Sequence, residues 1–392
     1  MLKNVKKFKI MALLALSLTA AVPVISSTSV FALNDAGNKA INLHGYYFDA
    51  QSRSQLKIYF DKSLSGSVKE QFKIVRASDD ASQTISSLGT ASGGGWTSSG
   101  ASTGTTVTLG MQNNFDYDTL YKVTISNTVG ANNNLTLGSF QNRKDYVFYF
   151  RTPDSGGNYT GDPIISFQPA NDADGVAYEG NVEFTVDRPV NAADLSGLLS
   201  SPNSGITLKK NISGTWTDVV TDPQFDSTAV SGAESYAKQV NDAHTFFFYP
   251  LTAGGTAAFS YDLDPSGTHQ YMLTLPAFDD VGTGHFDGAS ITFDTVSSDI
   301  PGKLSAAPTV GTVGSTSVSL TWSGATGATS YKVYYSTDPY WGFEDHLAGS
   351  TTGTSYTVNS LSPSTTYYFR VTPVNAGGEA GYSPKATATT TP

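Results

Sequence analysis

Apolar and polar residues alternate with a period of two between residues 361 and 371. Tyr367, Phe369 and Val371 fall on one side of this stretch, and Arg370 falls on the other. Successive side chains of a β-strand point to opposite faces, so the pattern predicts a turn that leads into a half-buried strand. We expect the side with Tyr367, Phe369 and Val371 to face a core.

The same alternation recurs along the chain and predicts short strands separated by turns. Charged residues make up only 14% of the chain and aromatic residues 12%, with 38 glycines, which favours strands and turns over helices. The sequence therefore predicts an all-β fold, a tandem array of three β-sandwiches. The alternating segments are 56–60, 72–74, 107–109, 121–125, 146–152, 182–186, 271–275, 291–295, 318–322, 331–336 and 355–358.

The last group of segments carries the spelling L-x-P-x-T-x-Y-x-F-x-V at residues 361–371. This spelling closely resembles the E–F corner and F strand of a fibronectin type III domain. In that family the corner tyrosine, here Tyr367, turns its hydroxyl back onto the preceding backbone. Trp322 and Tyr331 lie where the family places its core tryptophan on strand B and the start of strand C. The resemblance implies such a domain over residues 299–392, with structural roles for these three aromatic residues.

The two preceding units contain an internal repeat. Its order is a strand with an Asp-Lys or Asp-Arg turn, a variable middle, a strand that begins with Tyr, and a closing strand with Phe-x-Thr. That order is similar to the bacterial Ig-like domains of S-layer and other cell-surface proteins, and it implies such domains over residues 33–153 and 154–298. The matching segments are LKIYFDKSL (56–64) with VEFTVDRPV (182–190), YKVTI (121–125) with YMLTL (271–275), and FYFRT (148–152) with ITFDT (291–295).

The first 32 residues have the features of an export signal peptide. Four lysines precede an apolar run at residues 10–25, and Val30-Phe31-Ala32 provides a small-x-small cleavage site. Pro23 and the serines that follow interrupt the run before it reaches the length of a membrane anchor. We expect cleavage after Ala32, a secreted location with possible association with the cell surface, and no membrane span in the mature chain.

The net charge excludes one class of partner, and the cysteine content excludes two kinds of stabilising bond. The chain has 33 acidic and 23 basic residues, and loss of the four lysines of the signal leaves 19 basic residues and a net charge of -14. Phosphate binding needs clustered Lys and Arg, so nucleic acid is not expected as a partner. With no cysteine, the chain can form neither disulfides nor thiolate metal sites, and its domains must be stabilised by their cores.

Motifs that would indicate catalysis are weak. Residues 100–104 match G-x-S-x-G, but Gly and Ser flank the motif where a nucleophile elbow needs a strand and a helix. The five histidines lie singly, and none has the spacing of a metal pair. We therefore expect no enzyme and no catalytic residues. A pair of glycosidase carboxylates across a cleft in the second unit is an alternative that spacing alone does not reveal.

An acidic loop is a candidate for structural Ca²⁺. Residues 171–175 read N-D-A-D-G, which places Asp172 and Asp174 as at the start of a Ca²⁺ loop. The later oxygen ligands and the glutamate near the twelfth position are missing, so ordinary polar-loop chemistry is the alternative. Asp279, Asp280 and Asp287 form a fainter candidate. No other cofactor is expected.

The aromatic group Tyr340, Trp341 and Phe343 is the main candidate for ligand binding. It follows the predicted strand 331–336 in a segment with several acidic residues. Aromatic rings close together on a loop can stack on sugar rings or anchor a protein partner. The alternative is that Trp341 packs over the edge of its own sandwich or into the junction with the second unit. The sequence leaves both interpretations open.

These patterns predict a non-catalytic secreted or cell-surface scaffold or adhesion protein, whose loops and strand edges make contacts. The rival interpretation is a carbohydrate-binding accessory protein of a secreted polysaccharide-degrading system, with Trp341 and its neighbours contacting carbohydrate. The expected partner is a cell-wall or extracellular polysaccharide or a surface protein.

Overall fold

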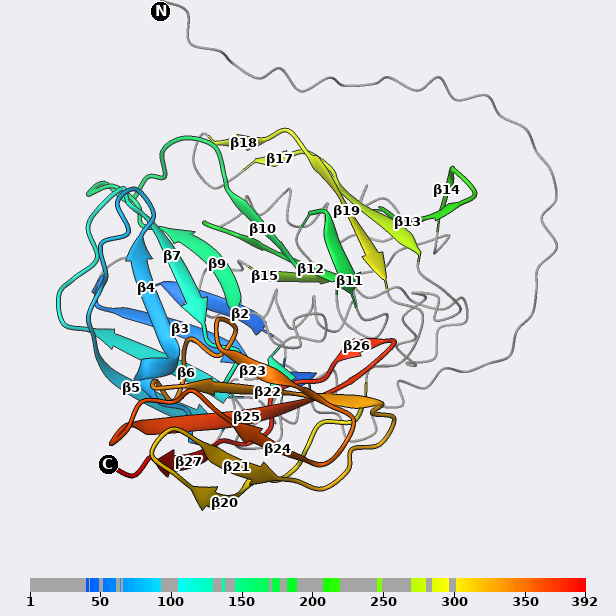
Figure 1. Cartoon of the computed structure of the whole chain (residues 1–392). Helices are drawn as coiled ribbons and strands as arrows, with labels where there is room; N and C mark the ends of the chain where they lie inside the picture. Colours follow the sequence, from blue (N-terminus) through cyan, green and yellow to red (C-terminus); the bar gives the residue numbers. More distant parts are fainter. Residues whose placement is uncertain are drawn as a thin grey trace, which may run out of the picture. The chain divides into compact units, whose positions relative to one another are not determined.

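The computed structural model describes the parts of the chain that carry most of the predicted strands. The described secondary structure consists of β-strands and one short 3₁₀-helix, η1 (Lys69–Gln71) (Figure 1). The all-β prediction is therefore confirmed. The chain divides into residues 1–31 and residues 32–392. The described residues are 40–41, 43–48, 52–60, 64, 66–92, 105–129, 136–137, 145–168, 171–176, 182–188, 207–218, 245–248, 269–279, 284–295 and 301–392.

Two predictions from the sequence fall outside this description. They are the export signal of residues 1–32 and the G-x-S-x-G motif at residues 100–104. Where the structure describes the chain, it contains no helix long and apolar enough to cross a membrane.

The first sandwich has two antiparallel sheets, with strand orders β2-β3-β6-β5 and β4-β7-β9. Side chains alternate between buried and half-buried along β6 and β7, as the sequence pattern predicts. The inward-facing residues of both sheets, among them Ile58, Val123 and Phe148, meet in one apolar core. The strands are β1 (Ala40–Ile41), β2 (Leu43–Phe48), β3 (Gln55–Phe60), β4 (Phe72–Arg76), β5 (Ile85–Ser92), β6 (Thr105–Met111), β7 (Leu120–Ile125), β8 (Thr136–Leu137) and β9 (Tyr146–Arg151).

The second sandwich has sheets with strand orders β10-β12-β15 and β11-β19-β16-β13-β14. Tyr271, Leu273, Ile291 and Phe293 are buried on the neighbouring strands β16 and β19. The strands are β10 (Ile165–Gln168), β11 (Ala173–Val176), β12 (Val182–Val186), β13 (Thr207–Ile212), β14 (Thr215–Asp218), β15 (Thr245–Phe248), β16 (Gln270–Leu275), β17 (Phe278–Asp279), β18 (His285–Phe286) and β19 (Ala289–Thr295).

The Asp-Arg turn of the repeat is fully buried in this second unit. Asp187 and Arg188 have no exposed side-chain surface and pair at 3.0 Å. The Arg188 guanidinium also donates to the carbonyl oxygens of Gly161 and Asp162 at 2.7 and 3.1 Å. These bonds fix the backbone of residues 161–162, which lead into β10.

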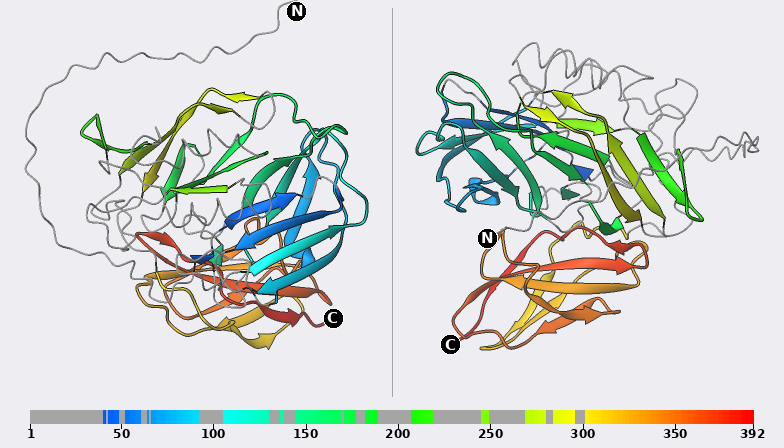
Figure 2. Two further views of the ribbon diagram at one scale, coloured as in Figure 1. Left: turned by 180° about the vertical axis from the view of Figure 1, so that it is seen from behind. Right: turned by 90° about the horizontal axis from the view of Figure 1, so that it is seen from above.

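The third sandwich has a sheet β20-β21-β24 and a sheet in which β22 lies between β23 and β25, and β26 and β27 also pair with β25. Figure 2 shows the two layers. Phe369 and Val371 are fully buried, and the core also contains Trp322, Tyr331 and Tyr367. The predicted inward side of residues 361–371 is therefore confirmed. The strands are β20 (Thr309–Val313), β21 (Val318–Thr321), β22 (Ser330–Ser336), β23 (Leu347–Thr351), β24 (Ser355–Val358), β25 (Thr366–Asn375), β26 (Gly378–Glu379) and β27 (Ala386–Thr389).

All three sandwiches share one connectivity. When the strands of each unit are lettered along the chain, A, B and E form one sheet, and C, F and G form the other. The A-B-E sheets contain β2-β3-β6, β10-β12-β15 and β20-β21-β24, and the C-F-G sheets contain β4-β7-β9, β13-β16-β19 and β22-β25-β27. Among the described strands, pairing stays within each unit. The fold is thus a tandem array of Ig-like and fibronectin III-like sandwiches.

The first and third sandwiches also share a corner built on a tyrosine. The amide of Asp116 donates to the Tyr121 hydroxyl oxygen at 2.9 Å, and the amide of Ser362 donates to the Tyr367 hydroxyl oxygen at 3.0 Å. In both cases the tyrosine lies five residues after its donor and begins a buried face of strand F. The hydroxyl thus pairs a backbone amide that the turn leaves without a partner in the sheet.

A threonine directly after the last strand completes each corner. Thr152 Oγ1 accepts from the amide of Thr119 at 2.9 Å and donates to the carbonyl oxygen of Asp116 at 2.6 Å. Thr390 Oγ1 makes the same two bonds at 2.9 and 2.6 Å, with Thr365 and Ser362.

The second unit repeats part of this arrangement. The amide of His269 donates to Thr295 Oγ1 at 3.3 Å, two residues before Tyr271. In all three units a threonine at the end of strand G therefore ties that strand to the segment that leads into strand F.

We predict that Thr152→Val and Thr390→Val each lower the free energy of unfolding of their own sandwich by about 1–3 kcal/mol. Valine keeps the shape of threonine but removes both side-chain hydrogen bonds of the half-buried corner, each worth about 0.5–1.5 kcal/mol. Denaturant unfolding followed by residue-resolved hydrogen exchange would assign each loss to its sandwich. Thr387→Val is the matched control, because Thr387 is exposed on β27. Equal losses from Thr390→Val and from the control would contradict this role of the threonine.

Candidate functional site

The segment of residues 338–344, called here the aromatic loop, follows β22 and has a well-defined backbone. Asp338 Oδ1 accepts from the amides of Tyr340 and Trp341 at 2.8 and 3.2 Å. The Ser336 hydroxyl donates to the carbonyl oxygen of Trp341 at 2.8 Å. Gly342 takes a φ of 77°, which glycine adopts without strain. Short polar side chains thus fix the backbone of the loop without any contribution from the aromatic rings.

The three aromatic residues of the loop have different surroundings. Phe343 is buried in a second apolar cluster with Tyr334 and Tyr382, and it offers no exposed ring. Tyr340 and Trp341 are half-buried. Of the three aromatic rings, those of Tyr340 and Trp341 therefore remain accessible.

Arg370 lies beneath the aromatic loop and corrects one expectation from the sequence. The alternating pattern places it on the solvent side of a half-buried strand, yet only 1% of it is exposed. Its guanidinium carbon lies 5.1 Å from the centre of the Phe343 ring, and Nη1 donates to the carbonyl oxygen of Ser383 at 2.8 Å. The aromatic loop and the segment before β27 cover this face, and a periodic pattern within one strand carries no information about such a cover.

Two cations lie in this region, and neither forms an ion pair within 4.0 Å with a carboxylate of the described residues, although Asp338 acts on Lys385 from a greater distance. Burial lowers the pKa of Arg370 to about 10. Burial, with the neighbouring Arg370 charge, also lowers the pKa of Lys385. The Lys385 ammonium lies 5.1 and 5.2 Å from the ring centres of Tyr340 and Tyr368. Aromatic ring faces thus provide part of the electrostatic environment of these cations.

The side chain of Trp341 contacts the first sandwich. Its indole Nε1 donates to the carbonyl oxygen of Glu70 at 2.5 Å, and the Lys73 ammonium lies 3.7 Å from the indole ring centre. Neither residue belongs to the third sandwich or to the second unit, the two packing partners that the sequence suggested for Trp341.

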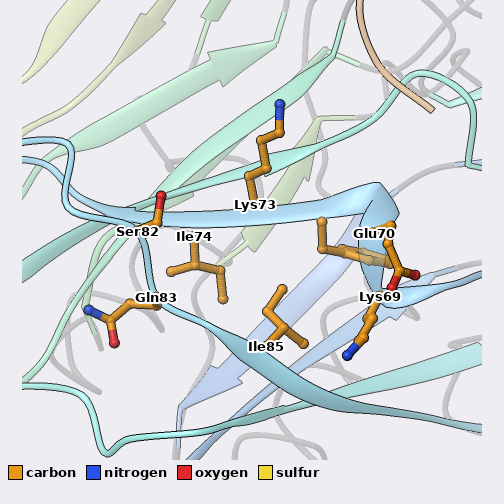
Figure 3. A pocket seen from close by; sticks show the side chains of 8 residues that line it. Lys69, Glu70, Lys73, Ile74, Ser82, Gln83 and Ile85 are labelled. Atoms are coloured by element: carbon orange, nitrogen blue, oxygen red, sulfur yellow. The ribbon is translucent and has the colours of Figure 1, made fainter. Parts of the chain in front are cut away.

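A shallow depression of about 250 Å³ lies on the first sandwich next to these contacts. It opens between β4 and β5, the edge strands of the two sheets, and Figure 3 shows Ile74 and Ile85 pointing into the space between them while Lys73 points away. The lining combines the apolar residues Phe72, Ile74 and Ile85 with the charged residues Lys69, Glu70 and Lys73.

The carboxylate of Asp172, the first residue of the Ca²⁺ candidate, has protein partners on both oxygens. Oδ1 accepts from the Thr292 hydroxyl and Oδ2 from the Asn171 amide, each at 2.9 Å. The side chain of Asp174 lies outside the described residues. The described residues contain no group of three or more His, Asp and Glu side chains placed to hold a metal ion. Ca²⁺ at this loop stays a prediction.

The fainter acidic candidate has a histidine at its centre. His285 Nδ1 lies 2.5 Å from Asp279 Oδ1, and Nε2 lies 3.6 Å from Asp287 Oδ1. The hydrogen bond with Asp279 raises the pKa of His285. Asp280 lies outside the described residues.

Comparison with known proteins identifies the third unit. Residues 305–389 match the family model of the fibronectin type III domain. No curated protein matches the chain.

Several solved structures are similar to parts of the chain. FN3tt is 28% identical, with a TM-score of 0.21, and covers 24% of this chain and 96% of its own. A fibronectin type III domain of the human fibronectin type III domain containing protein 3 is 28% identical, with a TM-score of 0.20, and covers 23% and 85%. The chicken CNTN1 FN1–FN3 domains are 12% identical, with a TM-score of 0.25, and cover 90% and 98%. These TM-scores are low, so the assignment of the third unit rests on the family match and on the strand connectivity.

We predict that Asp338→Ala loosens the aromatic loop. The amides of Tyr340 and Trp341 lose their acceptor, so they exchange hydrogen faster by a factor that corresponds to about 1 kcal/mol. Asp338→Asn keeps an oxygen acceptor and is expected to retain the slow exchange. Asp345→Ala, in the exposed residue next to the loop, is the matched control, and an equal acceleration there would show that Asp338 has no special role.

Proposed function

We propose that this protein is a non-catalytic scaffold or adhesion protein that is secreted and acts outside the cell or at its surface. The observation that supports this proposal is the tandem array of three sandwiches with one connectivity, the last of which matches the fibronectin type III family. Such sandwiches hold loops at the ends of rigid sheets, where they contact partners. The partner would be a cell-wall polysaccharide, an extracellular polysaccharide or a surface protein.

We further propose that the first two units are bacterial Ig-like domains of the kind found in S-layer and other cell-surface proteins. A repeated aromatic pair supports their relationship to each other. Tyr121 stacks on Phe150 with ring centres 5.4 Å apart, and Tyr271 stacks on Phe293 at 5.6 Å. In both units the two residues are direct cross-strand partners on strands F and G.

The chain from residue 33 onward should be retained by at least one fraction in a panel of cell walls, extracellular polysaccharides and surface proteins, without turnover of that fraction. A sandwich array that binds through loops has no reason to convert its partner. Release of soluble sugars or peptides above the level of a boiled sample would contradict the non-catalytic proposal. Absence of retention by every fraction would contradict adhesion.

A second candidate function is carbohydrate binding as an accessory of a secreted polysaccharide-degrading system. The fixed aromatic loop favours it, because Tyr340 and Trp341 are held half-exposed on a rigid support. Rings fixed in this way can stack on the apolar faces of sugars with little loss of conformational entropy.

If this second function holds, Trp341→Ala should reduce retention on insoluble glycans by about tenfold or more, a typical effect of removing an aromatic anchor residue. The measurement is a pull-down across a range of protein concentrations. Trp216→Ala is the matched control, because Trp216 is also half-buried but lies on β14 of the second unit. Equal retention of both variants would remove Trp341 from any glycan site.

A further inference from the structure

We infer that the aromatic loop is an intramolecular docking element and that its partner is the first sandwich of the same chain. The docking surface consists of η1, β4 and the turn of residues 126–128 that follows β7. The loop and the docking surface belong to different sandwiches, but both lie within residues 32–392, which form one compact part of the chain. Both sides contribute side chains and backbone groups to the contact.

Trp341 is the centre of the contact. Its indole donates a hydrogen bond to the carbonyl oxygen of Glu70, in η1, at 2.5 Å. The Lys73 ammonium lies over the ring face at 3.7 Å from its centre. A tryptophan side chain has two polar features, the indole N–H and the ring face. Here the N–H donates to a carbonyl oxygen and the ring face contacts a cation.

The backbone and the acidic end of the loop make a second group of contacts. The Ser126 hydroxyl donates to the carbonyl oxygen of Tyr340 at 2.6 Å, and the Thr128 hydroxyl lies 3.5 Å from the same oxygen. The Asn127 side-chain amide donates to the Glu344 carboxylate. These contacts pair polar groups on both sides and leave the carboxylate of Glu344 with a donor.

The burial of the turn supports this assignment. Ser126, Asn127 and Thr128 are polar residues of a turn, yet only 0%, 7% and 2% of them are exposed. Polar residues in turns are ordinarily solvated, and burial is tolerated when each group has a hydrogen-bond partner. The aromatic loop supplies a partner for each of the three side chains, in addition to the bonds that Thr128 makes with Ser126 and Gln71 inside the first sandwich.

The chemistry of the contact indicates that it is reversible. Its described contacts are hydrogen bonds and one cation–π pair, and such contacts are individually weak in water. The covalent link between the sandwiches raises their effective concentration, which allows a weak contact to remain populated. Asp338 and Ser336 already fix the loop, so docking orders few additional groups.

Docking has a consequence for ligand binding, which rests on the carbohydrate-binding proposal above. The indole N–H and one face of Trp341 are engaged by the first sandwich. A glycan or protein that needs this side chain must compete with the docking surface. Variants of Lys73 that weaken docking would then bind such a ligand more tightly, whereas variants of Trp341 would lose both contacts.

The absence of cysteine from the chain allows a direct test. In the double variant Asn127→Cys/Glu344→Cys, the only two thiols replace side chains that contact each other in the docked state. The chain from residue 33 onward is treated with a short bismaleimide at low protein concentration. We expect an intramolecular cross-link, detected as a monomer in which both cysteine peptides are joined. Each single-cysteine variant is a control and should give no internal cross-link.

Trp341→Ala added to the cysteine pair should reduce the rate of cross-linking by about tenfold, because one hydrogen bond and one cation–π contact are lost. Trp216→Ala added to the same pair is the matched control and should leave the rate unchanged. Hydrogen exchange of β25 and β7 in each variant checks that both sandwiches remain folded.

The other outcomes overturn the inference. No cross-link in the folded cysteine pair would show that the loop does not dock. Cross-linked dimers in place of joined monomers would show that the loop contacts another copy of the chain. An equal rate with and without Trp341 would show that the tryptophan does not hold the contact. None of these results depends on glycan retention, so failure of docking and failure of the proposed function are distinguishable.

Discussion

The hydrogen bonds that close the corner between strands E and F are the constraint on which these sandwiches depend. The turn into strand F leaves one amide of a half-buried corner unable to join the sheet, and loss of its hydrogen-bond partner there is costly. The hydroxyls of Tyr121 and Tyr367 accept that hydrogen bond, and Thr152 and Thr390 tie the same turn to the last strand. In a chain without disulfides, such bonds hold the turn before strand F against the end of strand G.

The corner also determines what the opposite face of strand F can do. Once Tyr367 and Phe369 are fixed in the core, Tyr368 and Arg370 must point outward, where the aromatic loop and the segment before β27 cover Arg370. Burial of a cation without a carboxylate is unfavourable, and the lowered pKa of Arg370 reflects that cost. The Phe343 ring and the carbonyl oxygen of Ser383 offset part of it.

This arrangement connects the core of the third sandwich to its candidate for function. Phe343 packs inward over Arg370, while Asp338 and Ser336 hold the backbone, so Trp341 is presented on a supported loop. In the docked state that we infer, the Trp341 side chain contacts the first sandwich. Release of the loop from the docking surface would make the side chain accessible to a ligand. One loop would then couple the arrangement of the array to its binding, since the two uses of Trp341 exclude each other.

The sequence by itself determined the strands, the faces and one corner. Alternation with a period of two predicted the buried side of residues 361–371, because a core accepts apolar side chains from one face of a strand. The second corner had a readable signal too: Phe115, Thr119 and Tyr121 have the same spacing as Leu361, Thr365 and Tyr367. The other residues of this segment differ from those of residues 361–371, and they obscured the shared spacing.

Only the tertiary structure decided the surroundings of Arg370 and Trp341. Arg370 is buried by residues from two other segments, and the hydrogen-bond partner of Trp341 lies 271 residues away along the chain. Local patterns report the period of an element and the geometry of a turn, because both depend on neighbouring residues. They carry no information about a distant segment that covers a strand or bonds to a side chain. Those contacts are therefore seen only in the tertiary structure.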